Sequence, residues 1–535
     1  MKPFLSSLLL TTLVSASGFA MAQVKPEVLV APSAFKGVHG LAVDQQGRLL
    51  AGSVVGSSIY QVDTKTGKVH TFIGPHEGQA DDIAIGPNGE MAWTAFTQGK
   101  VMYRENDEAS IRALADELPG INSIAFNQST GQLFASQVFL GDALWEIDLK
   151  GKQAPRLIAK DMGGFNGFEV GSDGWIYGPL WFKGQVVRIN PEDGEIKVVA
   201  DGLKTPAAVN FNSKGDLFVV DTQAGTLVKI DVSNGNKTTI AELSTSLDNL
   251  AIDPQDRIYV SNMADNSVIE VNPESGDTRT ITEGELAVPA GLVISEDGKT
   301  VYIADFFAFR SVDTETGQVT DLRRAHGSDA QYPTAVGMGE KHLYLTGLST
   351  NTLHIIKRDD MSTVALLTDF NAPSDAVELT DGSLVVSEMG SGSLIKLSGK
   401  DFANRATLAS ELNGPVQMAL GQDGQIYLTE ASGFLTRIDP ESGEVSRVAK
   451  DLAMPEGLAQ TADGQWIVAE TAAKQISKID LKTGQRSVLG KDLPIGLEAT
   501  PGMPPSGIPT GIAVDQKGTV YFGSDIDNGL YRLSF

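Results

Sequence analysis

Six equivalent positions in the first half of the sequence are spaced 41 to 44 residues apart, and five of them carry side chains that could bind a metal ion or move a proton. These positions are His39, Asp81, Asn122, Asn166, Ala207 and Asp248. Carboxylate and amide oxygens are the ligands that Ca²⁺ and Mg²⁺ prefer, and an imidazole also admits a transition metal. If the five polar side chains converge, the sequence predicts a site for a divalent metal, with Asp81 or Asp248 as the base that activates water.

The equivalent positions in the second half are less polar. They are Ala290, Thr334, Asp375, Val416, Glu456 and Thr510. Asp375 and Glu456 are the candidate metal ligands there, and Asp375 is the candidate base. An alternative applies to both halves, because polar groups at such positions also bind water and loop backbone. The same alternative is favoured for five further acids, which would fix the turns beside them: Asp305, Glu388, Glu430, Glu470 and Asp525.

All these positions belong to one repeat that occurs twelve times. Each copy alternates apolar and polar residues in short stretches separated by Gly-containing turns, which is typical of β-strands. The copies begin at Gly40, Asp82, Ser123, Gly167, Ala208, Asn249, Gly291, Ala335, Ala376, Gln417, Gly457 and Gly511. A period of about 40 residues in an all-strand pattern predicts the four-stranded blades of a β-propeller. The innermost strands of a propeller begin at one mouth of its channel, so the six positions of each half should meet there.

Twelve blades exceed the usual size of one ring, so we predict an all-β protein of two tandem six-bladed β-propellers. Residues 27–31 are expected to complete copy six, and residues 278–282 to complete copy twelve. Each ring would then have a 1+3 strand closure. The predicted domains are 23–276 and 277–535, and a single ring of twelve blades is the alternative.

Composition limits the partners and the location. The formal net charge of −25 argues against nucleic acid. Residues 1–22 resemble a secretory signal peptide, so we expect a periplasmic or secreted protein. No stretch of 18 apolar residues follows it, so no membrane span is expected. The absence of cysteine excludes disulfides. We expect a monomer that binds a small molecule (a lactone, an ester or a sugar-like compound) or a protein ligand.

Aromatic residues lie close to Asn166 in the sequence. Trp181 and Phe182 fall in a loop at the predicted channel mouth, where they could stack on a ligand. The remaining histidines are expected at the surface or in turns, because none is paired at metal-ligand spacing; they are His70, His76, His326, His342 and His354.

Several phrases resemble the senescence-marker-protein, gluconolactonase and luciferin-regenerating-enzyme family of six-bladed propellers. They are Phe165-Asn166-Gly167-Phe168, Pro289-Ala290-Gly291-Leu292 and Pro455-Glu456-Gly457-Leu458. The looser NHL-repeat group is similar too. The resemblance implies a channel metal, often Ca²⁺, held by a Glu, an Asn and an Asp, with the Asp as base in lactone hydrolysis.

The family's metal-binding set is divided between the two halves. Glu456 and Asp375 match its Glu and Asp, whereas Asn122 and Asn166 match its Asn pair. Two functions therefore stay open. One is a metal-dependent lactone or ester hydrolase, and the other is a non-catalytic double propeller that binds a protein, glycan or small ligand at its channel mouths.

Overall fold

The computed structural model describes residues 25–330, 332–499 and 506–534. These residues form twelve four-stranded antiparallel sheets, each a meander of neighbouring strands. The predicted signal peptide, residues 1–22, lies outside the described residues. Within the described residues, no helix is long and apolar enough to cross a membrane.

The first six sheets consist of β2 (Leu41–Val43), β3 (Leu49–Ser53), β4 (Ser58–Val62), β5 (Val69–Ile73); β6 (Ala80–Ile85), β7 (Met91–Ala95), β8 (Lys100–Arg104), β9 (Arg112–Ala115); β10 (Ile121–Phe126), β11 (Leu133–Gln137), β12 (Ala143–Ile147), β13 (Arg156–Lys160); β14 (Glu169–Val170), β15 (Ile176–Leu180), β16 (Gln185–Ile189), β17 (Ile196–Ala200); β18 (Pro206–Phe211), β19 (Leu217–Asp221), β20 (Thr226–Ile230), β21 (Lys237–Glu242); and β22 (Leu247–Ile252), β23 (Ile258–Asn262), β24 (Ser267–Val271), β25 (Thr278–Thr282).

The other six consist of β26 (Pro289–Ile294), β27 (Thr300–Asp305), β28 (Ala308–Asp313), β29 (Val319–Arg324); β30 (Ala335–Met338), β31 (His342–Gly347), β32 (Thr352–Lys357), β33 (Thr363–Leu367); β34 (Pro373–Glu378), β35 (Leu384–Glu388), β36 (Ser393–Ser398), β37 (Asn404–Ala409); β38 (Pro415–Leu420), β39 (Ile426–Glu430), β40 (Phe434–Ile438), β41 (Val445–Ala449); β42 (Pro455–Gln460), β43 (Trp466–Glu470), β44 (Gln475–Asp480), β45 (Gln485–Gly490); and β1 (Glu27–Val30), β46 (Ile512–Val514), β47 (Val520–Gly523), β48 (Leu530–Leu533). Three short 3₁₀ helices are η1 (Phe96–Gln98), η2 (Lys400–Phe402) and η3 (Thr471–Ala473).

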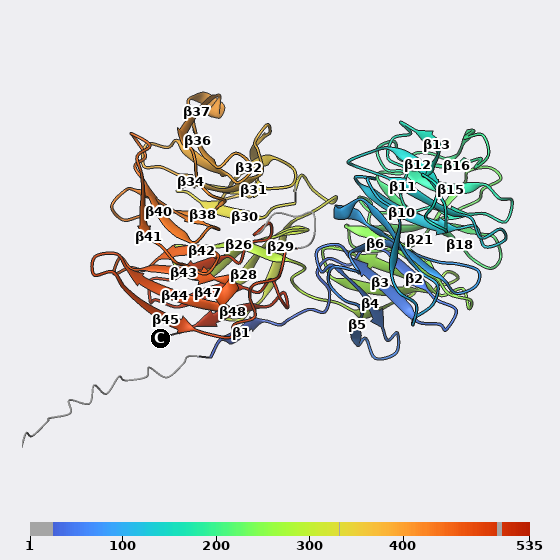
Figure 1. Ribbon diagram of the computed structural model, residues 1–535, viewed down its shortest axis with the longest axis horizontal. Helices are drawn as coiled ribbons and strands as arrows, with labels where there is room; N and C mark the ends of the chain where they lie inside the picture. Colours follow the sequence, from blue (N-terminus) through green and yellow to red (C-terminus); the bar gives the residue numbers. More distant parts are fainter. Residues whose placement is uncertain (1–24, 331, 500–505, 535) are drawn as a thin grey trace, which may run out of the picture.

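The sheets form two closed rings of six, as predicted. In the first ring, the innermost strands follow one another in the order β2, β6, β10, β14, β18 and β22, and β22 lies back against β2. The second ring runs through β26, β30, β34, β38, β42 and β46, and β46 lies back against β26. Figure 1 shows the two rings side by side. The fold class is therefore an all-β pair of six-bladed propellers.

The predicted closure of the rings is wrong in its strand assignment. β1 pairs with β48 in the twelfth sheet, where Glu27 lies opposite Arg532. β25 instead pairs with β24 in the sixth sheet, where Thr278 lies opposite Val271. A hairpin with a short turn costs less chain entropy than a distant pairing, which favours this local choice for β25.

Only the second ring therefore has the 1+3 closure. The boundary predicted near residue 276 moves to the connection between Thr282 and Pro289. The second ring also includes β1, which precedes the first ring in the chain.

The outermost strand of a blade is the most exposed. In the first blade every residue of the second strand β3 is buried, whereas the fourth strand β5 has one buried residue. The apolar clusters lie between neighbouring blades, as where Ile124 and Leu133 of the third blade pack with Ala92 and Val101 of the second. Blade-on-blade packing of this kind fixes where the innermost strands begin, and hence where the mouth residues lie.

The two rings are in direct contact. Arg324, at the end of β29, places its Nη1 2.6 Å from Asp265 Oδ1 and its Nη2 2.7 Å from Asp265 Oδ2 in the first ring. Arg310 of the second ring is fully buried and donates to the Ala264 carbonyl of the first. This contact region is called the seam below.

Candidate functional site

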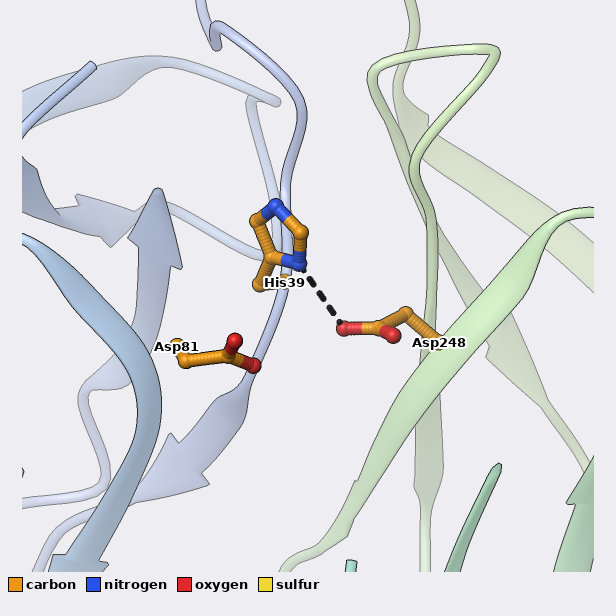
Figure 2. A group of neighbouring side chains, drawn as sticks. All are labelled: His39, Asp81 and Asp248. Atoms are coloured by element: carbon orange, nitrogen blue, oxygen red, sulfur yellow. Dashed lines mark ion pairs between the residues drawn. The ribbon is translucent and has the colours of Figure 1, made fainter. Parts of the chain in front are cut away.

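His39, Asp81 and Asp248 converge at one mouth of the first ring (Figure 2). Each offers a ligand atom, and these atoms all lie within 4.8 Å of one another. His39 Nδ1 is 3.3 Å from Asp248 Oδ2. Within the described residues, this is the one group of three or more metal-ligating side chains that the structure brings together.

A β-bulge at the start of the inner strands helps to aim these side chains. The pairing register shifts between Ala80 and Ile83 in β6, and between Leu247 and Leu250 in β22. A bulge turns side chains away from the regular alternation of a strand. Asp81 and Asp248 both lie inside such a bulge, so their carboxylates reach the channel mouth although the residues that follow them pack in the blade.

The two asparagines of the predicted set extend the cluster. Asn122 Nδ2 donates to Asp81 Oδ2 at 3.1 Å. Ser123 Oγ lies 2.8 Å from Asn122 Oδ1 and 2.9 Å from Asn166 Oδ1. Asn122 therefore contacts the cluster directly, whereas Asn166 is two hydrogen bonds further away, through Ser123. Ala207, the fifth position, is buried and contributes no polar group.

A second polar pair, not predicted from the sequence, lies beside the cluster. Asp82 Oδ1 accepts a hydrogen bond from Asn249 Nδ2 at 3.1 Å, which joins the second and sixth blades. Burial raises the pKa of Asp82 to about 7, although hydrogen bonds from the Ile124 and Ile83 amides oppose the shift. The sequence held a signal for this pair, because Asp82 and Asn249 directly follow the mouth residues Asp81 and Asp248 in the repeat.

The single imidazole of the cluster only partly balances the negative charge of its carboxyl groups. Burial raises the pKa of Asp81; the charge of His39 opposes the shift, and the charges of Asp248 and Asp82 reinforce it, so the net pKa lies well above its usual range. Burial lowers the pKa of His39, but the hydrogen bond and charge of Asp248 and the charge of Asp81 outweigh it, and the net pKa is raised. Asp81 and Asp248 thus share one imidazole, and a cation would stabilise their charged forms.

The candidate ligands of the second ring have a different environment. Asp375 Oδ2 accepts from the Met418 amide and Oδ1 from the Ala376 amide, each at 2.8 Å. Glu456 Oε2 accepts from the Thr510 amide at 2.7 Å. Both carboxyl groups therefore tie one inner strand to the next, and no third metal-ligating side chain joins them among the described residues.

The five acids at the ends of the second strands bind backbone, as the structural alternative predicted. Their carboxylates accept hydrogen bonds from amides of the connection before the same blade: Asp305 from Ala287 and Val288, Glu388 from Asn371, Glu430 from Asn413, Glu470 from Ala453, and Asp525 from Gly496 and Leu497. These groups fix turns and are poorly placed to hold a channel metal.

A segment of the second ring approaches the mouth of the first ring. His326 packs edge-on against Trp181, with ring centroids 4.9 Å apart. Tyr332 Oη lies 2.6 Å from His326 Nε2. Burial lowers the pKa of His326 to about 4, and the opposing charge of Asp248 reaches it as well. Phe307 completes the approach with its ring 5.7 Å from that of His39.

His326 lies in a turn, as predicted, but inter-ring packing partly covers it. The prediction that His354 lies at the surface or in a turn is wrong, because this residue is buried in β32. The sequence held one signal that the segment around His326 is unusual. Its connection, residues 325–334, is longer than the equivalent connections 368–372, 410–414 and 450–454.

The two predicted ligand-stacking residues differ in exposure. Trp181 is buried between His326 and Phe139, whose ring lies 5.6 Å away. Phe182 is exposed and meets Phe139 at 5.9 Å. Phe139 was missed because its loop shows no repeat signature.

With two six-bladed propellers and a polar channel mouth, the protein has the architecture that the sequence resemblance implied. The chain belongs to the SMP-30/Gluconolactonase/LRE-like family, whose model matches residues 164–284 and 333–532, more than half of the sequence. This confirms the resemblance. The match in the first ring begins after His39, Asp81 and Asn122, so the geometry alone supports the cluster.

Comparisons with individual proteins add little. No curated protein matches the chain. Among solved structures, the extracellular domain of the putative hybrid two component system BT4673 from B. thetaiotaomicron is similar at 10% identity, over 96% of this chain and 83% of that one, with a TM-score of 0.32.

Proposed function

We propose that this protein is a metal-dependent hydrolase of lactones or esters, with its reaction centre at His39, Asp81 and Asp248. The observation that supports the proposal is the convergence of their ligand atoms within 4.8 Å at the channel mouth. Membership in a family that includes gluconolactonases agrees with it.

The residues present fit a divalent cation. Two carboxylates and an imidazole supply oxygen and nitrogen donors, which suit Mn²⁺ or Zn²⁺ as well as the Ca²⁺ expected from the family. Burial is the largest cause of the raised pKa of Asp81, and the charges of Asp248 and Asp82 add to it. When bound, the cation supplies Lewis acidity that polarises a carbonyl group.

The side chains have separable roles in this proposal. Asp248 orients the His39 ring through Nδ1, and Asn122 fixes Asp81 through Oδ2. Among the described residues, Asp81 Oδ1 has no hydrogen-bond partner. This oxygen is the group that accepts the proton of the attacking water.

Metal binding is the first test. We expect the purified protein to hold one divalent ion by elemental analysis and to gain melting temperature when Ca²⁺, Mn²⁺ or Zn²⁺ is added. A ligand present at 100 times its dissociation constant stabilises the native state by about 2.7 kcal/mol. Asp81→Asn and Asp248→Asn should abolish both effects.

The control is Asp375→Asn in the second ring, where the carboxylate binds two backbone amides. It should leave the metal content unchanged. A wild-type protein without metal, and with no shift in melting temperature, would refute the hydrolase proposal.

A second candidate is a non-catalytic double propeller that binds a ligand at its mouths. It is favoured by one observation: each ring carries half of the family's metal-binding set, Asn122 and Asn166 in one and Asp375 and Glu456 in the other. Saturable binding of a lactone or ester without turnover by the metal-loaded protein would support this candidate.

We also propose a periplasmic or secreted location, because residues 1–22 have the features of a signal peptide. Mass spectrometry of the mature protein tests this. A first residue at Gln23 is expected, and retention of residues 1–22 would contradict the proposal.

A further inference from the structure

A phenylalanine of the second ring packs against a candidate metal ligand of the first ring. Phe307 lies in the turn between β27 and β28 and is fully buried. Its ring meets the His39 imidazole edge-on, with the centroids 5.7 Å apart and the planes at 69°. Aromatic pairs prefer an edge-to-face arrangement, so this contact favours one orientation of the imidazole.

The first ring has space for this side chain at a glycine. Gly37 has φ of +70°, a conformation that other residues rarely adopt. A Cβ at this position would lie 2.2 Å from Cε2 of the Phe307 ring, which is far inside van der Waals contact. The Gly37 amide donates to Asn266 Oδ1 at 2.7 Å, which fixes the segment two residues before His39. Glycine here therefore lets the Phe307 ring reach the segment that carries the imidazole.

The second ring fixes Phe307 in place. The Phe306 ring lies edge-on to it at 5.0 Å, and the Tyr332 ring lies at 5.9 Å. The Phe307 carbonyl accepts a hydrogen bond from the Ala325 amide at 2.8 Å. Ala325 and Tyr332 both belong to the long connection 325–334. This connection therefore holds the side chain that contacts the first ring.

A polar contact of the first ring also orients the imidazole. His39 Nδ1 lies 3.3 Å from Asp248 Oδ2, at the long end of the hydrogen-bond range. A single contact of this kind fixes one nitrogen and leaves the ring able to tilt about it. The Phe307 ring limits that tilt, because a buried ring in a packed interior has little room to move.

We propose that Phe307 is a positioning residue for His39, so that the second ring prepares the first ring's site to bind its metal. The inference rests on the proposed function, because it concerns the same site. Phe307 offers no ligand atom and takes no part in hydrolysis. It keeps the imidazole directed toward Asp248. Removing a group that orients a metal ligand lowers metal affinity by about 10- to 100-fold.

Titration of the full chain with Co²⁺ tests the proposal. Phe307→Ala should weaken Co²⁺ binding by about 10- to 100-fold in calorimetry. It should also change the visible absorption of the bound ion, which reports the geometry of the ligands. Phe307→Leu keeps an apolar side chain beside His39 and should recover most of the affinity. A role in stability alone would leave the absorption of the bound ion unchanged.

Phe309→Ala is the matched control. Phe309 is also fully buried, but it packs between two blades of the second ring. Both variants lose the same atoms and should lower the melting temperature, whereas only Phe307→Ala should change Co²⁺ binding. Tight Co²⁺ binding by folded Phe307→Ala, equal to that of the wild type, would overturn the proposal, and so would an equal loss in Phe309→Ala. If Phe307→Ala does not fold, Phe307→Val takes its place with the same outcomes.

A measurement without metal separates this proposal from the proposed function. In metal-free protein labelled with ¹⁵N-histidine, the Nδ1 proton between His39 and Asp248 should exchange slowly with water and give an NMR signal that His39→Gln lacks. Phe307→Ala should lose this signal, and Phe309→Ala should keep it. That result in a protein that binds no Co²⁺ would support the positioning role and refute the metal-dependent hydrolase. Co²⁺-dependent hydrolysis, with the signal intact in Phe307→Ala, would do the reverse.

Discussion

Two neighbouring carboxylates of the first ring have different chemical surroundings. Asp82 corresponds to Asp375 of the second ring, because each accepts the amide of the next residue and an amide of the neighbouring inner strand: Asp82 from Ile83 at 2.9 Å and Ile124 at 3.2 Å, and Asp375 from Ala376 and Met418. Asp81 corresponds to Ser374, since Ile83 and Ala376 pair with the same position of the second strand. Because Asp82 ties the inner strands together, Asp81 is left available for the cluster.

The sequence therefore predicted the positions of the mouth residues but not their surroundings. Aligning the repeats placed His39, Asp81 and Asp248 in one set because equivalent residues of a ring share one end of the channel. A carboxylate binds a backbone amide only where a strand of the neighbouring blade faces it. The alternation of residues within one strand does not show which strand faces it, so this contact could not be predicted.

Glu169 gives a pH prediction at this scale. Burial raises its pKa to about 7, although hydrogen bonds from the Phe211 amide and from Asn210 oppose the shift. The native state thus holds this proton more tightly than the unfolded chain. The resulting stability is fully present below about pH 4.5 and declines as the pH rises to about 7.

Glu169→Gln should therefore flatten the pH dependence of the unfolding free energy. The difference between wild type and variant should change by about 1–3 kcal/mol between pH 4.5 and pH 8, measured by urea unfolding. The exposed Glu192→Gln is the control. Parallel pH profiles for wild type and Glu169→Gln would show that the carboxyl group is not protonated in the native state.

Among the elements, the individual blades were predictable because they are local. Alternating residues and Gly-containing turns set the three strand pairings of a blade within a short stretch of chain. Ring closure is different, since any unpaired strand with the right alternation suits either ring. The contact between the connection 325–334 and the first ring was not predicted either, because residue alternation within a blade does not report contacts between the rings.

Val30→Asp tests the closure by β1. Val30 is fully buried against Leu286 and Leu530, whereas Val28 is half exposed. A buried unpaired charge should detach β1 and reduce the protection of β46–β48 in hydrogen exchange. Protection of β22–β25 should persist, and Val28→Asp should have little effect. Loss of protection in β22–β25 would instead support the closure expected from the sequence.

For the whole molecule, the seam makes the two rings one unit in which the second ring covers part of the first ring's site. The Arg324 and Asp265 side chains are 16% and 30% exposed and form two hydrogen bonds. Because solvent reaches this pair, breaking it should cost less than the about 3–5 kcal/mol of a fully buried ion pair.

Arg324→Leu should loosen the seam without unfolding either ring. We expect one calorimetric transition in the wild type and two resolved transitions in the variant. The control is Arg358→Leu, which removes the more exposed pair with Glu296 at 3.3 Å. A single transition in Arg324→Leu, at the wild-type temperature, would show that this pair does not couple the rings.

The pairing of β1 with β48 also determines the order in which the molecule can fold. Glu27 and Arg532 bind each other across 505 residues, so the whole first ring is inserted between two strands of one blade. During synthesis the first ring has every strand it needs long before β48 leaves the ribosome. The final blade must wait for the last strands of the chain, and pairings between such distant segments form slowly. Throughout that interval β1 is an unpaired edge strand. The β1 strand of a second molecule could therefore pair with β48 instead.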